Sequence, residues 1–235
     1  MITYNKEFVI SFRDVDGHGN LRIHALVDFM QDTAREAATA LGVNFETPDV
    51  EYYWIIIRSK INMTRIPKID EKIRIETHYS GADRLYAVRE FHIYDQDQAK
   101  IGDITAYYLL MEHGKTRPVK IKGNPNFTIF DQVYTGEKVE KLVVSQAPVV
   151  RSVNRQVFSS DIDVNGHMNN AHYVRWCFDM YENRERQASP VQSFQIQYVK
   201  EMLEHTQVTV QRHADGTVVG ADGDTVHFIG KIYFE

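Results

Sequence analysis

The sequence contains a single cysteine, Cys177, so no disulfide can form within the chain. A lone thiol is typical of proteins in a reducing compartment. Long hydrophobic runs are also missing, because the longest apolar stretches, near residues 52–57 and 107–111, are far shorter than the roughly 20 residues of a membrane-spanning helix. The first 20 residues carry charges every few positions and contain no signal-peptide core. We therefore expect a cytoplasmic protein that does not enter a membrane.

The chain also lacks an excess of positive charge. It has 27 Lys and Arg against 32 Asp and Glu, a formal net charge of −5, whereas nucleic-acid binding favours basic surfaces. Its 10 histidines show no metal-ligand spacing. We expect no nucleic-acid partner, no metal and no cofactor.

One polar segment stands out, residues 160–173, in which Asp163, Asn165 and His167 fall within five positions. Apolar residues at helical spacing follow up to Tyr181, and Asn169 or Asn170 can cap the first turn of that helix. The free N–H groups of the turn would then form a site for a developing oxyanion. An acid, an amide and an imidazole beside a helix N-terminus suit hydrolysis of an activated carbonyl.

The first half of the chain carries a similar segment. Residues 14–18 read DVDGH and residues 163–167 read DVNGH, so four of five residues agree at an offset of 149. Each segment follows a strand-like stretch and precedes an amphipathic helix, which indicates an internal duplication. At this offset His18 corresponds to His167 and Asp16 to Asn165. The first helix should begin after Asn20 as its cap and end at Gly42.

In the rest of the sequence, apolar and polar residues alternate as they do in antiparallel strands. A first strand is predicted over residues 7–12, and Asp215-Gly216 and Asp222-Gly223 predict tight hairpins near the end of the chain. One helix followed by antiparallel strands, occurring twice, is an α+β arrangement. The predicted domains are residues 1–135 and 147–235, joined by a linker over 136–146.

This order of elements resembles the double hotdog fold, in which each half is a long helix wrapped by an antiparallel sheet. The residues resemble the acyl-acyl carrier protein (acyl-ACP) thioesterases, which end fatty-acid elongation. The stretches that carry the resemblance are residues 161–170 (DIDVNGHMNN), 198–201 (YVKE), 54–58 (WIIIR), 65–67 (RIP) and 73–77 (IRIET). The plant members carry a long transit peptide that is missing here, so the resemblance favours a bacterial enzyme.

The resemblance implies that Asp163, Asn165, His167 and Glu201 are catalytic. Glu201 would be the general base, while Asn165 and His167 would orient water or polarise the carbonyl. The sequence leaves open whether Asp163 supports His167 or attacks the carbonyl itself. Met202 stands where some members carry a cysteine, so no cysteine nucleophile is assigned. The first-half residues Asp14, Asp16 and His18 have no evident counterpart of Glu201, and we expect a degenerate site there, with the first half holding the acyl chain.

The implied partner is an acyl carrier protein bearing a fatty acyl group. Six cationic residues could meet an acidic carrier: Arg65, Lys68, Lys115, Arg117, Lys120 and Lys122. An acyl-CoA thioesterase of the hotdog superfamily and a catalytically inactive acyl-binding protein remain alternatives. A hotdog hydratase fits less well, because its histidine lies one residue further on and proline follows its asparagine. The sequence leaves open the acyl chain length and the choice between monomer and homodimer.

Overall fold

The computed structural model describes residues 3–42, 52–115, 117–121, 123, 132–182, 185 and 191–234. The chain divides into two compact units. Unit 1 consists of Met1–Leu21 and Asp28–Val139, and unit 2 consists of Arg22–Val27 and Glu140–Glu235. The Lys122 side chain, named above as a cationic candidate, lies outside the described residues.

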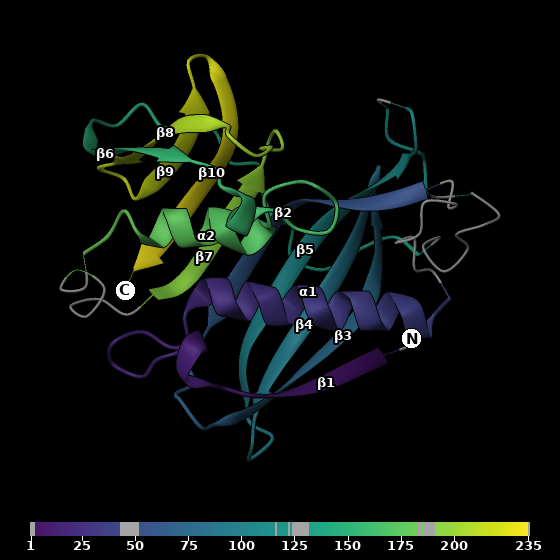
Figure 1. Ribbon diagram of the computed structural model, residues 1–235. Helices are drawn as coiled ribbons and strands as arrows, with labels where there is room; N and C mark the ends of the chain where they lie inside the picture. Colours follow the sequence, from purple (N-terminus) through teal and green to yellow (C-terminus); the bar gives the residue numbers. More distant parts are fainter. Residues whose placement is uncertain are drawn as a thin grey trace. The chain divides into compact units, whose positions relative to one another are not determined.

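Unit 1 is an antiparallel sheet with a long helix across one face (Figure 1). The strand order within it is β1-β3-β4-β5-β2. Phe29 of the helix stacks on Phe8 of the edge strand, with ring centroids 4.3 Å apart. The elements are β1 (Thr3–Val9), the 3-10 turn η1 (Phe12–Asp14), α1 (Ile23–Ala40), β2 (Tyr52–Met63), β3 (Lys72–Asp83), β4 (Tyr86–Asp95) and β5 (Lys100–Glu112).

The alternation of apolar residues along these strands builds one buried face. Ile75 lies opposite Ile93, and Phe91 lies opposite Ile104 in the strand register. All four side chains are fully buried. Burial of each side chain contributes about 1.5–3 kcal/mol to the stability of the fold. A shift of one residue would turn these side chains to the other face of the sheet, so the alternation fixes the register.

Unit 2 repeats the plan with a shorter helix. Its strand order is β7-β10-β9-β8-β6. The helix packs on the sheet through aromatic contacts, with Tyr173 meeting Phe228 edge-on at 5.5 Å and Phe178 meeting Phe194 at 5.1 Å. The elements are β6 (Val149–Gln156), the 3-10 turn η3 (Ser159–Asp161), α2 (Asn170–Phe178), β7 (Val191–Tyr198), β8 (Gln207–His213), β9 (Thr217–Asp222) and β10 (Thr225–Phe234).

Cys177 has a packing role in this unit. It is fully buried, and burial raises the pKa of its thiol. A Cβ added at Gly230 of β10 would lie only 2.5 Å from the Cys177 sulfur, so the glycine lets the helix approach the strand. Cys177 therefore acts as a small apolar side chain.

The N-terminal prediction needs two corrections. The first strand covers Thr3–Val9 rather than residues 7–12, because Ser11 ends it by closing a 3-10 turn in which its N–H donates to the Asp14 carboxylate (2.8 Å). Asn20 does not cap α1, whose first residue is Ile23. Asn20 instead forms an isolated bridge with Lys68.

Other predicted ends are confirmed. Gly42 follows α1 with a φ of +67°, the left-handed conformation that favours glycine. β9 and β10 meet across Asp222 and Thr225, so Gly223 lies in a two-residue hairpin turn as expected. The second helix is shorter than its apolar pattern, since it ends at Phe178 and not at Tyr181.

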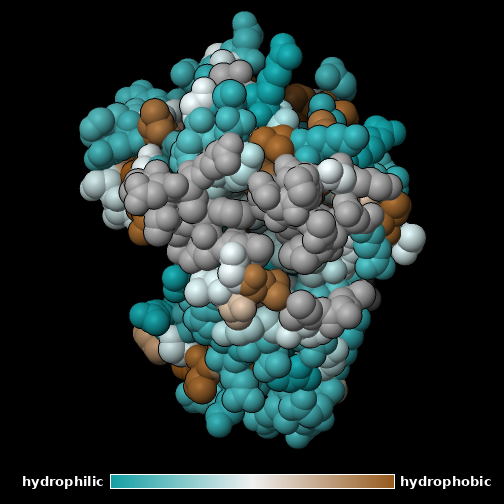
Figure 2. All heavy atoms as spheres, turned by 90° about the vertical axis from the view of Figure 1, so that its right-hand side faces the viewer, coloured by the Kyte–Doolittle hydropathy of each residue, from teal (hydrophilic) through white to brown (hydrophobic). Residues whose placement is uncertain are grey.

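Figure 2 shows one face of the molecule, where hydrophilic side chains predominate and hydrophobic ones form small separate patches. In the described part of the chain, no helix combines the length and apolarity needed to cross a bilayer.

Candidate active site

A tight turn in unit 2 carries Asp163, Asn165 and His167. The N–H of Asp163 donates to the carbonyl oxygen of His167 (2.8 Å), and the N–H of Gly166 donates to that of Asp163 (3.0 Å). One carboxylate oxygen of Asp163, Oδ1, accepts the N–H of Asn165 (2.8 Å). Gly166 has a φ of +77°, which glycine adopts without steric cost. The backbone thus brings the three predicted residues together and uses one oxygen of Asp163 to do so.

Asn169 confirms the predicted cap of α2. Its side-chain oxygen accepts the N–H of Ala171 (2.9 Å), and its carbonyl accepts the N–H of His172 (2.9 Å). These two N–H groups are therefore already satisfied. The expectation that the first helical turn offers them to an oxyanion is wrong, because the cap itself takes them.

Glu201 is brought to the same turn by its neighbour Met202. The N–H of Met168 donates to the carbonyl of Met202 (2.9 Å), and the N–H of Met202 donates to the hydroxyl of Tyr173 (3.0 Å). Burial raises the pKa of Tyr173 to about 12, and the negative charges of Glu201 and Asp163 add to this. The carboxylates of Asp163 and Glu201 therefore both raise the pKa of the Tyr173 phenol. Asp163 belongs to the segment that ends at Met168, and Glu201 belongs to the segment of Met202.

Solvent can reach this group of side chains. Asn165 and Glu201 are exposed, whereas Asp163 and His167 are half-buried. None of the four side chains is fully buried, so a substrate can approach all of them from solvent.

Unit 1 contains a turn with the same backbone hydrogen bonds. The N–H of Asp16 donates to the carbonyl of Asn20 (2.9 Å), and the N–H of Gly19 donates to that of Asp16 (3.0 Å). The carboxylate of Asp16 accepts the N–H of His18 (2.9 Å). Gly19 has a φ of +76°, so it occupies the left-handed position of this turn.

Matching the two turns corrects the predicted offset from 149 to 147. Asp16 then corresponds to Asp163, and the first-half histidine, His18, corresponds to Asn165 and not to His167. Asn20 takes the place of His167. The sequence match failed because it aligned the wrong glycines: the turn requires its left-handed glycine at position 19, whereas the five-letter match used the glycine at position 17.

The position of Glu201 also has a counterpart in unit 1. The N–H of Leu21 donates to the carbonyl of Pro67 (2.8 Å), as Met168 does to Met202. The residue before Pro67 is Ile66, so an aliphatic side chain stands where unit 2 has Glu201. A carboxylate base is missing from that position.

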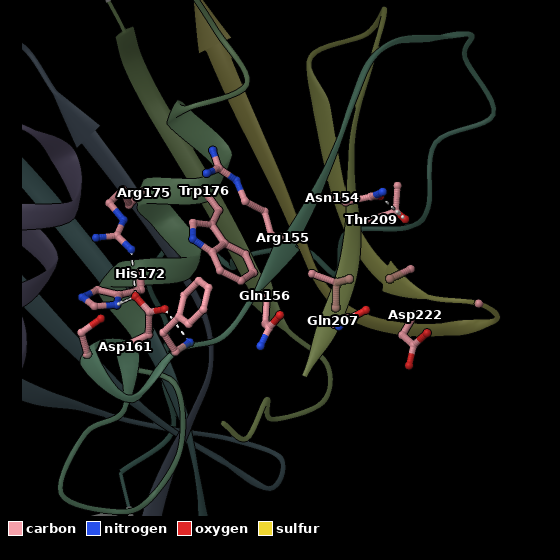
Figure 3. Close-up of a pocket in the computed structure, with 15 residues that line it drawn as sticks. Asn154, Arg155, Gln156, Asp161, His172, Arg175, Trp176, Gln207, Thr209 and Asp222 are labelled. Atoms are coloured by element: carbon pink, nitrogen blue, oxygen red, sulfur yellow. Dashed lines mark hydrogen bonds and ion pairs between the residues drawn. The ribbon is translucent and has the colours of Figure 1, made fainter. Parts of the chain in front are cut away.

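A groove of about 1000 Å³ beside α2 contains a cluster that the sequence analysis missed (Figure 3). Asp161, His172 and Arg175 line it and point toward one another. His172 and Arg175 lie three residues apart on α2. That spacing was visible in the sequence, but their shared partner, 11 and 14 residues away, was not.

The cationic residues named above are only partly available. Arg65 pairs with Glu71 (2.7 Å) and Asp95 (3.1 Å), and Lys115 pairs with Glu112 (3.2 Å). Exposed side chains remain at Lys68, Arg117 and Lys120. Among the residues that the structure describes, no three His, Cys, Asp or Glu side chains are grouped to hold a metal ion.

Comparison with known proteins gives consistent results along the chain. Residues 2–125 match the model of the acyl-ACP thioesterase N-terminal domain, and residues 149–227 match that of the C-terminal domain. The dodecanoyl-[acyl-carrier-protein] hydrolase of Umbellularia californica is 22% identical over 85% of this chain and 56% of its own length. The chain thus spans about half the length of this curated relative.

Two solved structures share the fold. An acyl-ACP thioesterase from Bacteroides thetaiotaomicron has a TM-score of 0.87 at 23% identity, covering 99% of this chain and 98% of that one. The 12:0-ACP thioesterase from Umbellularia californica has a TM-score of 0.83 at 19% identity, covering 99% and 97%. The predicted α+β tandem hotdog fold is confirmed.

Proposed function

Because this chain belongs to the acyl-ACP thioesterase family, we propose that it hydrolyses the thioester of a fatty acyl-acyl carrier protein, releasing free fatty acid and ending elongation. The observation that supports this is the pairing of Met168 with Met202, which joins the Asp163–His167 turn to the segment carrying Glu201. It supplies an acid, an amide, an imidazole and a second acid at one solvent-accessible place.

The proposed reaction is direct attack of water on the acyl carbonyl. Glu201, the exposed carboxylate, takes a proton from water as the new C–O bond forms. The side chains of Asn165 and His167 stabilise the oxyanion of the tetrahedral intermediate. Collapse of that intermediate breaks the C–S bond, and the proton held by Glu201 passes to the departing sulfur. No cofactor is needed in this scheme.

Asp163 is assigned an orienting role in this proposal. One of its oxygens already accepts the Asn165 N–H, and its backbone holds His167. These two contacts fix the carboxylate within the turn, which suits a group that orients Asn165 and His167. Asp163→Asn should therefore lower turnover without preventing the first step.

Alanine substitution tests the assignment. Asn165→Ala, His167→Ala and Glu201→Ala should each lower kcat on acyl carrier protein thioesters by about 10²-fold or more while leaving the fold intact. His18→Ala is the matched control, because His18 occupies the place of Asn165 in a turn of the same geometry. It should keep most of the activity. Near-normal turnover in two of the three unit 2 variants contradicts the proposal.

The acyl carrier protein is the proposed donor, acting in the cytoplasm. Lys68, Arg117 and Lys120 are exposed and could attract an acidic carrier. If they do, hydrolysis of carrier-bound substrate should slow as salt rises, whereas a small thioester should be unaffected. A preference for the coenzyme A ester at every salt concentration would instead favour an acyl-CoA thioesterase.

A further inference from the structure

We propose that Asp161, His172 and Arg175 form a positioning clamp that fixes the catalytic turn of unit 2 onto α2. The inference rests on the proposed function, since it assigns these residues to the same site. None of the three belongs to the set of Asp163, Asn165, His167 and Glu201. Their role is to act through the backbone on either side of that set.

Asp161 is the centre of the clamp. Its side chain is nearly buried, 7% exposed, and one oxygen, Oδ1, accepts from His172 Nδ1 (2.8 Å) and Arg175 Nη2 (2.9 Å). The other oxygen, Oδ2, accepts the N–H of Phe158 (3.0 Å). A single carboxylate thus ties the chain entering the turn to two positions on the helix that follows it.

The backbone of Asp161 extends this connection to the far end of the turn. Its carbonyl accepts the N–H of Asn169, the cap of α2, at 2.9 Å. The preceding residue, Met168, makes the bond to Met202 that brings in Glu201. Displacement of Asp161 would therefore move both ends of the turn and the segment after β7 that carries Glu201 and Met202.

Unit 1 shows that the turn forms without such a clamp. Asp14 is the counterpart of Asp161, and its carboxylate accepts the N–H of Ser11 in the same way. With the offset of 147, the helix positions of His172 and Arg175 correspond to Ala25 and Asp28, and neither is a cation. The clamp is therefore not required for the turn to fold. It is added only in the unit that carries the complete catalytic set.

The charges of the clamp are balanced. Burial alone would raise the pKa of Asp161, but the Phe158 N–H and the two helix residues outweigh it, so the carboxyl pKa is lowered. Burial, and then the charge of Arg175, lower the pKa of His172. A neutral His172 must carry its proton on Nδ1, because a carboxylate can only accept. The cluster is then one anion, one cation and one neutral ring, a stable arrangement that holds Asp161 in place across neutral pH.

The test compares Asp161→Asn with Asp14→Asn, the same change at the unclamped counterpart. Asp161→Asn should lower kcat about tenfold or more with KM within about twofold, because a small misplacement of catalytic groups costs rate rather than binding. Asp14→Asn should leave kcat within about twofold. The double variant Asp161→Asn/Arg175→Met removes the cation left unpaired, so its melting temperature should recover toward wild type while kcat stays low.

Backbone amide exchange gives a second readout that needs no activity. In Asp161→Asn the N–H groups of Asp163 and Gly166 should exchange about tenfold faster, and in Asp14→Asn their rates should not change. Equal effects of the two single variants, or recovery of kcat together with stability in the double variant, overturn the clamp. A wild-type protein that hydrolyses no acyl carrier protein thioester refutes the proposed function instead, and the exchange rates then decide the clamp alone.

Discussion

Replacing Tyr173 with phenylalanine should separate the support of Glu201 from its chemistry. The Tyr173 hydroxyl accepts the N–H of Met202 at 3.0 Å. Both residues are buried, with Tyr173 3% exposed and Met202 0% exposed. Phenylalanine keeps the ring and its edge-on contact with Phe228 but removes the acceptor. The change therefore leaves one buried N–H without a partner beside the proposed base.

The size of the effect follows from that orphaned donor. A buried unsatisfied N–H costs about 1–3 kcal/mol in the free energy of unfolding. For a chain of this size each kcal/mol corresponds to about 2–4 °C, so the melting temperature should fall by about 2–12 °C. Because Glu201 is bonded directly to Met202, kcat should also fall, by about tenfold or more.

Calorimetry and steady-state hydrolysis measure the two effects. Tyr233→Phe is the control, since Tyr233 is 38% exposed and removal of an exposed hydroxyl should change stability by less than about 0.5 kcal/mol. If Tyr173→Phe changes stability by no more than the control and keeps a normal kcat, the contact between Tyr173 and Met202 does not hold Glu201 in place.

Three further predictions concern residues away from this contact. The interaction with His78, whose Nε2 lies 3.6 Å from a Glu90 carboxylate oxygen, is the main reason that the pKa of Glu90 is lowered to about 2. The contribution of ionised Glu90 to stability is therefore complete above pH 4.5 and lost as pH falls toward 2. Glu90→Gln should flatten acid unfolding in that window, and an unchanged curve would refute this. Gly81→Ala should destabilise unit 1, because a Cβ there would lie 2.6 Å from the Gln132 carbonyl oxygen at a φ of +121°; a wild-type urea midpoint contradicts it. Cys177, with its raised pKa and full burial, should resist alkylation until the protein unfolds, and rapid native labelling would show otherwise.

Alternation along the strands is visible in the sequence because one buried face imposes a period of two on the side chains, although the first strand lies over Thr3–Val9 and not over residues 7–12. Residues 72–80 alternate, and the observed strand is Lys72–Asp83. The sequence also predicted the Asn169 cap and grouped Asp163, Asn165 and His167, which share one turn, since these are local features. A local pattern is legible because each residue acts on near neighbours in the chain.

The errors came from backbone conformation and contacts that the letters of the sequence do not show. The register of the duplicated turns depends on which glycine has a positive φ, and letters alone do not distinguish Gly17 from Gly19. The helix N–H groups seemed free until the cap was seen to take two of them. The clamp could be recognised only in the folded structure, because Asp161 and Arg175 lie 14 residues apart in the sequence.

Because the turn of unit 1 has the same backbone geometry as that of unit 2, it could carry the proposed catalytic side chains. Asp16 already corresponds to Asp163. Three substitutions, His18→Asn, Asn20→His and Ile66→Glu, would add the counterparts of the other three proposed residues to this turn and its paired segment. Such a graft in a chain carrying His167→Ala would have the four side chains but no clamp. Its rate, set against the native site, would measure how much of a catalytic centre is its chemical groups and how much is the scaffold that steadies them.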